Sequence, residues 1–271
     1  MNEASELNEL LQIDAETVAD FQRNGFVRLE GVLSPPLLGE MGGAITDLVK
    51  ALNTQTKPLA ERSTYDRAFL QVMNLWRHDD SVRSFVLGRR LASVAAQLLD
   101  VQAVRLYHDQ ALYKEPGGGL TPAHADQYYW PVDSDRTVTA WIPLQATDIE
   151  MGPLAFYAGS HQIALGRDQP ISDESERNIA AAMESKGFEL TVEPFSLGDV
   201  SFHRGWTFHK AGANRSSQTR SVMTIIYMDA RTKLKAPENE KQRSDAAQWC
   251  PGVRVGETIA SRINPIVFDR T

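Results

Sequence analysis

The sequence changes character near residue 100, and this change constrains the fold more than any other feature. Before it, apolar residues recur at the three- and four-residue spacing of amphipathic helices. After it, short runs rich in β-branched and aromatic residues are separated by glycine and proline. The segments expected to form strands are 103–114, 137–147, 153–157, 188–195, 199–203 and 220–229. This order predicts an α+β fold, with a β-sandwich or jelly roll packed against N-terminal helices.

Several helix boundaries are marked by residues that favour helix ends. Asp14 is a candidate N-cap, and Gly25 is expected to end that helix before an extended stretch over 26–29. Ser34, followed by two prolines, predicts the start of a second helix that continues to Leu52. Segment 69–76 fits a helix and a strand equally well. Further helices are expected over 79–87, 89–99 and 172–186.

The chain has 271 residues, of which 42% are apolar, enough for a substantial core. No low-complexity linker divides it, so we expect one domain over 1–271. Within that domain we expect a mainly helical layer over 1–100, a jelly-roll core over 101–230 and a C-terminal extension over 231–271.

Composition excludes several classes of protein. The net charge of −7 argues against binding to nucleic acid or to an anionic membrane. Cys250 is the single cysteine, so an intrachain disulfide, a four-cysteine zinc site and a cysteine-held iron–sulfur cluster are excluded. The acidic N-terminus does not resemble a signal peptide, and no run of 18 apolar residues occurs. We therefore expect a soluble, cytoplasmic protein whose metal ligands, if any, are histidines and carboxylates.

One short motif suggests a metal site. His124 and Asp126 are two residues apart, so in an extended segment both side chains point to the same face. Segment 198–209 offers His203 and His209 as candidates for a third ligand. Two histidines and one carboxylate on one face of an octahedron form the triad of non-heme Fe(II) oxygenases. A His-x-Asp sequence alone is more typical of a surface turn or a salt-bridged histidine than of a metal site.

Arg220 follows His209 by eleven residues and begins the apolar run 221–228. An arginine cannot lose its charge, so its burial is costly unless a carboxylate pairs with it. Its planar guanidinium suits the far end of a dicarboxylate ligand. The alternative is an internal ion pair with an acidic residue of the same chain.

Three segments together resemble a known family. They are TPAHADQYYWPVDSDRTVTAWIPLQ, MGPLAFYAGSH and GDVSFHRGWTFHKAGANRSSQTR, which occur in this order within residues 20–230. They resemble the phytanoyl-CoA dioxygenase (PhyH) family of Fe(II)- and 2-oxoglutarate-dependent oxygenases. The resemblance implies a double-stranded β-helix, which is a cupin-like jelly roll, with metal and co-substrate at one open end and the N-terminal helices packed outside.

The resemblance also implies roles for individual residues. His124, Asp126 and His209 would be the Fe(II) ligands, and Arg220 would hold the distal carboxylate of 2-oxoglutarate. Trp141 matches a tryptophan near the co-substrate, with an ordinary core aromatic as the alternative. Family members often carry a hydroxyl residue two places after the distal histidine, where this chain has Ala211.

Gln110 and Lys114 have even spacing on the strand that precedes the glycine loop, so both side chains can face the barrel interior. We expect Lys114 to support 2-oxoglutarate, with a solvent-exposed lysine as the alternative. Gln110 is expected to reach either co-substrate or substrate.

The other histidines are assigned different roles. His203 competes with His209 for the third ligand position, and the resemblance favours His209 because only it has the arginine at the family spacing. His161 lies in a recurrent turn of the family and is expected to order a loop. His78 and His108 are expected to be structural.

Aromatic residues are the main candidates for substrate contact. Tyr128, Tyr129 and Trp130 directly follow the His-x-Asp motif, and we expect them at the mouth of the pocket, although simple packing is an alternative. Residues of the N-terminal layer expected to close the pocket are Gln71, Met73, Asn74 and Trp76. No basic cluster suits the phosphates of coenzyme A, so a small polar metabolite is expected rather than a fatty acyl-CoA.

These inferences lead to one main functional hypothesis. The chain is expected to use Fe(II), 2-oxoglutarate and O2 to hydroxylate a small molecule, with release of succinate and CO2. Asp126 favours this reaction, because halogenating relatives lack the carboxylate and place chloride there. The alternatives are a metal-binding, cupin-like isomerase or sensor without oxygenase activity, and a protein-interaction domain with an inactive site. We expect no nucleic-acid or membrane partner.

Overall fold

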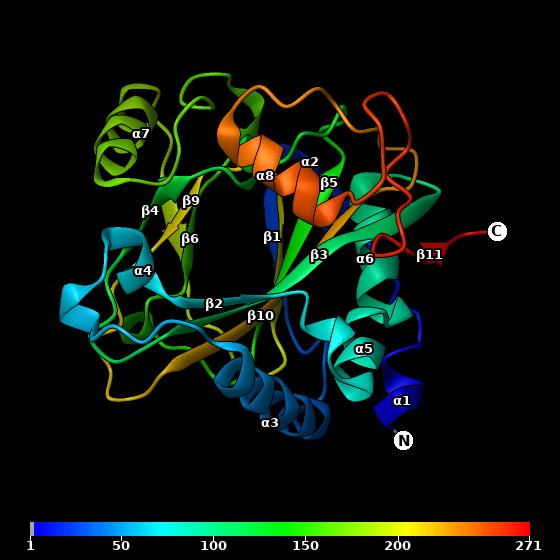
Figure 1. Cartoon of the computed structure of the whole chain (residues 1–271), viewed down its shortest axis with the longest axis horizontal. Coiled ribbons are helices and arrows are strands. Elements are labelled where there is room, and N and C mark those ends of the chain that lie inside the picture. Colours follow the sequence, from blue (N-terminus) through cyan, green and yellow to red (C-terminus); the bar gives the residue numbers. More distant parts are fainter. Residues whose placement is uncertain (1–2) are drawn as a thin grey trace.

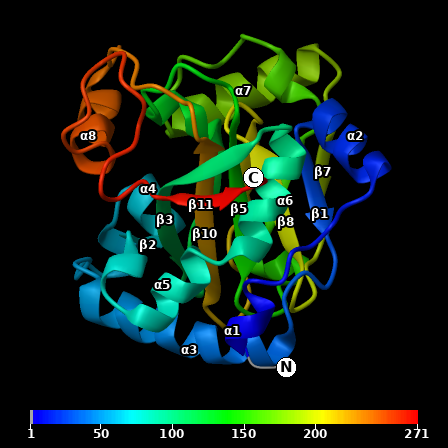
Figure 2. The same ribbon diagram turned by 90° about the vertical axis from the view of Figure 1, so that its right-hand side faces the viewer.

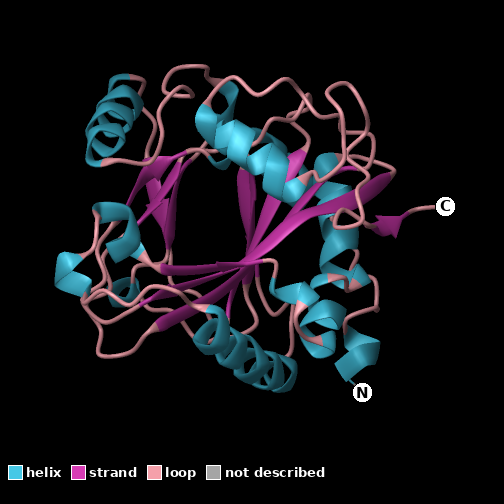
Figure 3. Ribbon diagram, in the orientation of Figure 1, coloured by secondary structure: helices cyan, strands magenta, loops and turns pink. Residues whose placement is uncertain are grey.

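The computed structural model describes residues 3–271, which form two antiparallel sheets flanked by helices (Figures 1 and 3). In spatial order, the large sheet contains β1 (Phe26–Leu29), β8 (Val200–Arg204), β5 (Thr137–Pro143), β10 (Arg220–Asp229), β3 (Ala103–Lys114) and β11 (Ile266–Asp269), and β2 (Leu70–Met73) also pairs with β3. The small sheet contains β4 (Thr121–His124), β9 (His209–Ala211), β6 (Leu154–Tyr157) and β7 (Leu190–Val192). The predicted jelly roll is confirmed.

The helices begin and end where local signals place them. In α2, the Asp14 carboxylate accepts a hydrogen bond from the Thr17 amide at 2.7 Å, and Gly25 ends the helix at a φ of 80°. The side chain of Ser34 caps the N-terminus of the next helix, α3, in the same way. The helices are α1 (Glu3–Glu6), α2 (Ala15–Asn24), α3 (Pro35–Leu52), α4 (Thr64–Ala68), α5 (Asp80–Val86), α6 (Arg89–Leu99), α7 (Asp173–Ser185) and α8 (Glu240–Trp249).

The helical layer covers the outer face of the large sheet, as predicted. Figure 2 shows α5 and α6 in front of its strands. Fully buried side chains from both layers form the main core, among them Leu37, Ile45, Phe85 and Leu98 from the helices, and Leu106, Ile142, Phe202 and Ile225 from the sheet. Each such side chain contributes about 1.5–3 kcal/mol by leaving water. Because the helical layer packs on the outer face of the large sheet, the inner faces of the two sheets can form a site.

Some elements differ from the sequence-based expectation. The ambiguous segment 69–76 contains a strand, β2, followed by the 3-10 helix η2 (Leu75–Arg77). The strand expected over 137–147 ends at Pro143, and the one over 188–195 shortens to the exposed edge strand β7. The sequence did not predict β4, β9, α8 and β11, because short strands and weakly amphipathic helices carry little periodic signal.

Two helices lie outside the helical layer, next to the small sheet and the open end of the barrel. Helix α7 lies beside β4, and α8 crosses the upper end of the barrel in Figure 1. No helix within residues 3–271 combines the length and the apolarity that crossing a bilayer requires.

Candidate metal centre

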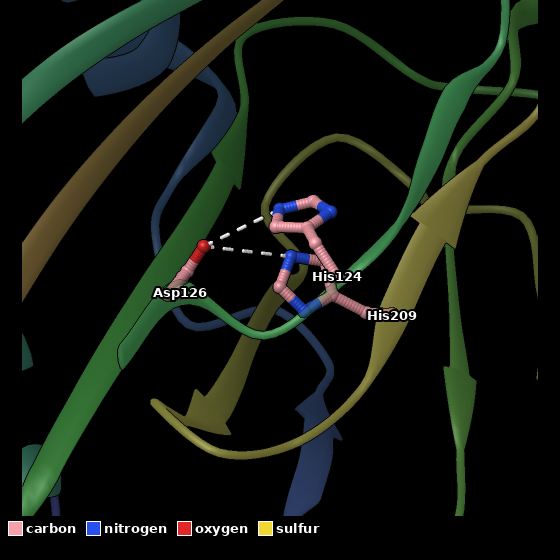
Figure 4. Close-up of side chains that lie close together, drawn as sticks. All are labelled: His124, Asp126 and His209. Atoms are coloured by element: carbon pink, nitrogen blue, oxygen red, sulfur yellow. Dashed lines mark ion pairs between the residues drawn. The ribbon is translucent and has the colours of Figure 1, made fainter. Parts of the chain in front are cut away.

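Two neighbouring strands of the small sheet bring two histidines side by side. His124 is the last residue of β4 and His209 is the first residue of β9, and the two are directly paired in the antiparallel register. Their ring centroids are 4.2 Å apart. Asp126 lies just beyond β4, at the start of the 3-10 helix η3 (Asp126–Tyr129), and its carboxylate faces both rings (Figure 4).

The three side chains are close enough to share one metal ion. Asp126 Oδ1 lies 3.5 Å from His124 Nε2 and 3.7 Å from His209 Nε2. All three ligand atoms lie within 4.8 Å of one another. Metal–ligand bonds of about 2.1 Å at right angles place neighbouring ligand atoms about 3 Å apart. Small side-chain adjustments would therefore bring these atoms to an octahedral face.

Hydrogen bonds behind the ligand atoms fix their orientation. His124 Nδ1 lies 2.8 Å from the Pro122 carbonyl oxygen, and His209 Nδ1 lies 3.0 Å from that of Thr207. A carbonyl oxygen only accepts, so each Nδ1 carries the hydrogen and each Nε2 keeps its lone pair for a metal.

The Asp126 carboxylate is held in the same manner from its far side. Asp126 Oδ2 accepts hydrogen bonds from Thr139 Oγ1 at 3.0 Å and from His203 Nε2 at 3.2 Å. These bonds orient the carboxylate so that its other oxygen, Oδ1, points toward His124 and His209. His203, on β8, thus binds the carboxylate from behind, and the structure groups His209 rather than His203 with the other two candidate ligands.

Electrostatics favour the protonation states that bind metal. Burial opposes ionisation of Asp126, but the three surrounding histidines, His209, His124 and His203, outweigh it and hold the pKa of the carboxyl well below its usual range. Burial, reinforced by His124, lowers the pKa of His209 well below its usual value. An ionised carboxylate and a neutral imidazole are the forms that coordinate a cation.

Helix α7 braces both histidine-bearing strands from outside. Ser175 Oγ donates to the Ala123 carbonyl oxygen at 3.1 Å, and Glu176 accepts from the Ala123 amide at 2.7 Å. The other oxygen of Glu176 pairs with Lys210. Ala123 precedes His124 and Lys210 follows His209, so one carboxylate connects the neighbours of both histidines. These bonds also satisfy backbone groups at the edge of the small sheet.

Arg220 is a buried cation across the cavity. It is 1% exposed, it donates to the Gly152 carbonyl oxygen, and its guanidinium lies over the Trp141 ring at 5.5 Å. Within residues 3–271 the structure records no ion pair to it, so the alternative of an internal ion pair is wrong. Burial lowers its pKa to about 10, which leaves it charged at neutral pH.

Two buried donors in this region have no hydrogen-bond acceptor among the described residues. They are Arg220 Nε and Trp141 Nε1, and both residues line the same cavity. Leaving buried donors unpaired costs about 1–3 kcal/mol each. A buried cation with unpaired donors beside it therefore indicates a site for an anionic ligand.

Lys114 lies opposite Arg220 in the strand register but does not line the cavity. It is fully buried, so the solvent-exposed alternative is wrong. Its Nζ lies 2.7 Å from the Gly119 carbonyl oxygen, 2.8 Å from that of Gly212 and 3.2 Å from Thr121 Oγ1. Lys114 therefore connects the glycine loop to the beginning of β4 and the end of β9. Burial, together with Arg220, lowers its pKa to about 6.

A cavity of about 500 Å³ joins the histidine cluster to Arg220 and extends to α8. Gln110 and Trp130 line it, and so do Gln71 and Met73. Contact of Gln110 and Trp130 with a substrate stays a prediction. Tyr128 instead faces a separate surface hollow beside Trp206, and its neighbour Tyr129 lines the cavity. Asn74 and Trp76 are buried elsewhere.

Other residues occupy places that sequence reasoning assigned differently or missed. His108 was expected to be structural but lines the cavity, and burial lowers its pKa to about 4. Its even spacing with Gln110 could have indicated this position. His161 Nε2 lies 3.2 Å from the Gln22 carbonyl oxygen, and His78 is exposed after η2. The α8 residues at the cavity carried no sequence signal of that role.

Comparisons with known proteins agree with this architecture. The family model for phytanoyl-CoA dioxygenase (PhyH) matches residues 21–222. The phytanoyl-CoA dioxygenase domain-containing protein 1 homolog of Caenorhabditis briggsae is 22% identical, over 83% of this chain and 94% of that protein. The 1-deoxypentalenic acid 11-beta-hydroxylase of Streptomyces exfoliatus is 26% identical, over 78% of each chain.

A solved structure shares the fold. The epimerase SnoN, in complex with Fe3+, alpha ketoglutarate and nogalamycin RO, superposes with a TM-score of 0.78 at 23% identity, covering 93% of this chain and 98% of SnoN. The family match spans most of the chain and includes all three clustered residues and Arg220. The chain therefore belongs to the phytanoyl-CoA dioxygenase (PhyH) family.

Proposed function

We propose that this protein is an Fe(II)- and 2-oxoglutarate-dependent oxygenase that hydroxylates a small molecule. The observation that carries the proposal is the pairing of two sites in one cavity. One is a histidine–carboxylate cluster with its lone pairs directed inward, and the other is a buried guanidinium with no counter-ion in the part of the chain that the structure describes. The same pairing supports treating residues 1–271 as one catalytic domain.

The chemistry of the side chains fits the metal. His124, Asp126 and His209 would hold Fe(II) on one face, and three coordination positions would remain for co-substrate and O2. When bound, iron and 2-oxoglutarate supply the oxidising chemistry, with release of succinate and CO2. Thr139 and His203 keep the Asp126 carboxylate in its orientation.

The other end of the site fits a dicarboxylate. Arg220 would bind the distal carboxylate of 2-oxoglutarate, and Trp141 Nε1 offers a second donor nearby. Ala211 lacks the hydroxyl common in the family, but Thr121 lies directly opposite it in the strand register and also lines the cavity. We infer that the Thr121 hydroxyl takes this role. Lys114 would act indirectly, by holding Thr121.

Hydroxylation is favoured over the other outcomes of this chemistry. The carboxylate of Asp126 occupies the position that halogenating relatives leave to chloride. Similarity to a hydroxylase supports the same reaction, and similarity to SnoN makes epimerisation the second candidate. The cavity walls would orient one C–H bond toward the metal and exclude water. A cupin-like isomerase or sensor would not need Arg220.

Anaerobic titration of the metal-free protein tests the proposal. Adding Fe(II) and then 2-oxoglutarate should produce the weak visible charge-transfer band of the ternary complex. Arg220→Met should retain iron but lose the band, and Asp126→Ala should lose iron binding and substrate-coupled succinate release. Wild-type turnover by Asp126→Ala would refute the ligand assignment. Product analysis with candidate metabolites then distinguishes hydroxylation from epimerisation.

A further inference from the structure

The part of the cavity farthest from Arg220 contains a second carboxylate. Asp245, on α8, lines the cavity, and its Oδ2 accepts a hydrogen bond from the buried Tyr107 hydroxyl of β3. Within the described residues, no cation lies within 4 Å of Asp245, although Lys241 is one helical turn away on the same face. Lys241 is exposed and also borders the cavity.

Aromatic side chains surround this carboxylate. Trp249 follows Asp245 by four residues on the same face of α8, and Tyr129 and Trp130 line the cavity from η3 and the residue after it. Tyr107 contacts Trp130 edge-on, with ring centroids 5.6 Å apart, and Trp249 lies 5.3 Å from the His108 ring. This part of the cavity therefore combines aromatic rings with Asp245, and the other polar side chains that α8 brings to it are Lys241, Ser244 and Gln248.

The charge balance differs between the two ends of the cavity. At the metal end, the Asp126 carboxylate faces two histidines, and the Arg220 guanidinium is positioned to bind an anion. At the α8 end, Asp245 is a carboxylate that has no cation within 4 Å among residues 3–271, and burial raises its pKa to about 7. His108 does not compensate for it, because burial keeps that imidazole neutral. A cationic ligand would restore the missing charge and would contact aromatic faces at the same time.

We propose that the α8 end of the cavity is a subsite for a protonated amine of the substrate, seated between the Asp245 carboxylate and the Trp249 and Trp130 rings. This inference rests on the proposed function, because it assigns the substrate part of the same cavity. The amine would be held away from the metal, so that a different part of the substrate faces the reacting centre. Lys241 would be expected to weaken binding of the amine.

The structure provides a conservative variant for the test. Asp245→Asn removes the charge but keeps an oxygen that can accept the Tyr107 hydrogen bond. Helix α8 also remains anchored by Gln242, which donates to the Tyr128 carbonyl oxygen at 3.0 Å. Asp245 does not contact the candidate ligands of iron or 2-oxoglutarate, so the charge-transfer band should be unchanged in this variant.

The probes are three molecules with one carbon skeleton: cyclohexylmethylamine, cyclohexylmethanol and cyclohexanecarboxylate. Each is titrated into the full-length protein loaded anaerobically with Fe(II) and 2-oxoglutarate, at about pH 8 so that Asp245 is ionised. Tryptophan fluorescence reports binding, since Trp130 and Trp249 line the subsite. We expect the amine to bind at least about tenfold more tightly than the alcohol, and the carboxylate to bind least.

The variants decide the inference. Asp245→Asn should abolish the preference for the amine and leave the affinity for the alcohol unchanged, and Lys241→Gln should strengthen amine binding. Equal binding of amine and alcohol by the wild type, or an undiminished preference in Asp245→Asn, would overturn the subsite. Absence of the charge-transfer band would instead contradict the proposed function, so the two failures are distinguishable.

Discussion

Replacing Arg220 by methionine should make the ligand-free protein more stable while destroying its affinity for 2-oxoglutarate. Arg220 is buried, has no counter-ion among the described residues, and has a pKa lowered to about 10 by that burial. Each pKa unit is worth about 1.4 kcal/mol, so the charge costs the folded apoprotein about 3 kcal/mol. Losing the hydrogen bond to Gly152 offsets about 1 kcal/mol of the gain. Methionine is flexible enough to fill the space.

The expected net effect is a gain of about 2 kcal/mol in the free energy of unfolding, or roughly 4–8 °C in the melting temperature. Urea unfolding of both proteins without metal measures it. With Fe(II) present anaerobically and 2-oxoglutarate at about 100 times its Kd, the wild type should gain about 2.7 kcal/mol, because only the folded state binds. Arg220→Met should gain almost nothing from 2-oxoglutarate, so the order of stability reverses.

Arg62 provides a matched control. Its side chain is 7% exposed, like that of a core residue, but it forms an ion pair with Glu115. Arg62→Met should lower the stability of the apoprotein, because Glu115 is then left without its partner. If ligand-free Arg220→Met is less stable than the ligand-free wild type, the burial of the Arg220 charge does not cost the folded protein the free energy inferred above, and the reasoning is refuted. An undiminished gain from 2-oxoglutarate would refute the role of Arg220.

Two further predictions concern residues behind the site. Burial holds the pKa of Lys114 at about 6, so between that pH and the ordinary lysine range the unfolded chain binds a proton that the folded chain does not. The free energy of unfolding should therefore fall with decreasing pH over this window, by up to about 1.4 kcal/mol per pH unit. Urea unfolding between about pH 7 and 9 measures this dependence, and the free energy of unfolding of Lys114→Met should change less steeply with pH than that of the wild type. Identical slopes for the two proteins would contradict the lowered pKa. Glu176→Ala should weaken Fe(II) binding about tenfold in equilibrium titrations, because β4 and β9 lose the carboxylate that connects them. The control is Glu174→Ala, on the exposed face of α7, which should bind Fe(II) as the wild type does. Equal affinities in the two variants would show that α7 does not position the histidines.

Local signals in the sequence were enough to predict most of the elements. Asp14 and Gly25 mark the ends of α2, and Ser34 marks the start of α3, because caps satisfy backbone groups of the adjacent residues only. The strands β3 and β10 match their predicted ranges fully. They are the two longest strands, and a long extended segment gives more sequence signal than a short one.

The candidate site was predictable where sequence spacing and family resemblance constrain it. The two-residue spacing of His124 and Asp126 suggested a shared direction, and the charge of Arg220 within an apolar run suggested a ligand or partner. Both features depend only on residues that are neighbours along the chain. They therefore identified a possible site without showing that His209 and Arg220 lie near His124 and Asp126 in the folded protein.

Tertiary structure decided the remaining properties. The pairing of β4 with β9 places His209 beside His124, whereas His203 arrives from the other sheet and reaches only the far oxygen of Asp126. Lys114 turns out to bind backbone carbonyls rather than line the cavity, and α8 supplies a carboxylate to its far end. These placements depend on contacts between residues about 80 to 140 positions apart, and such contacts leave no local pattern in a single sequence.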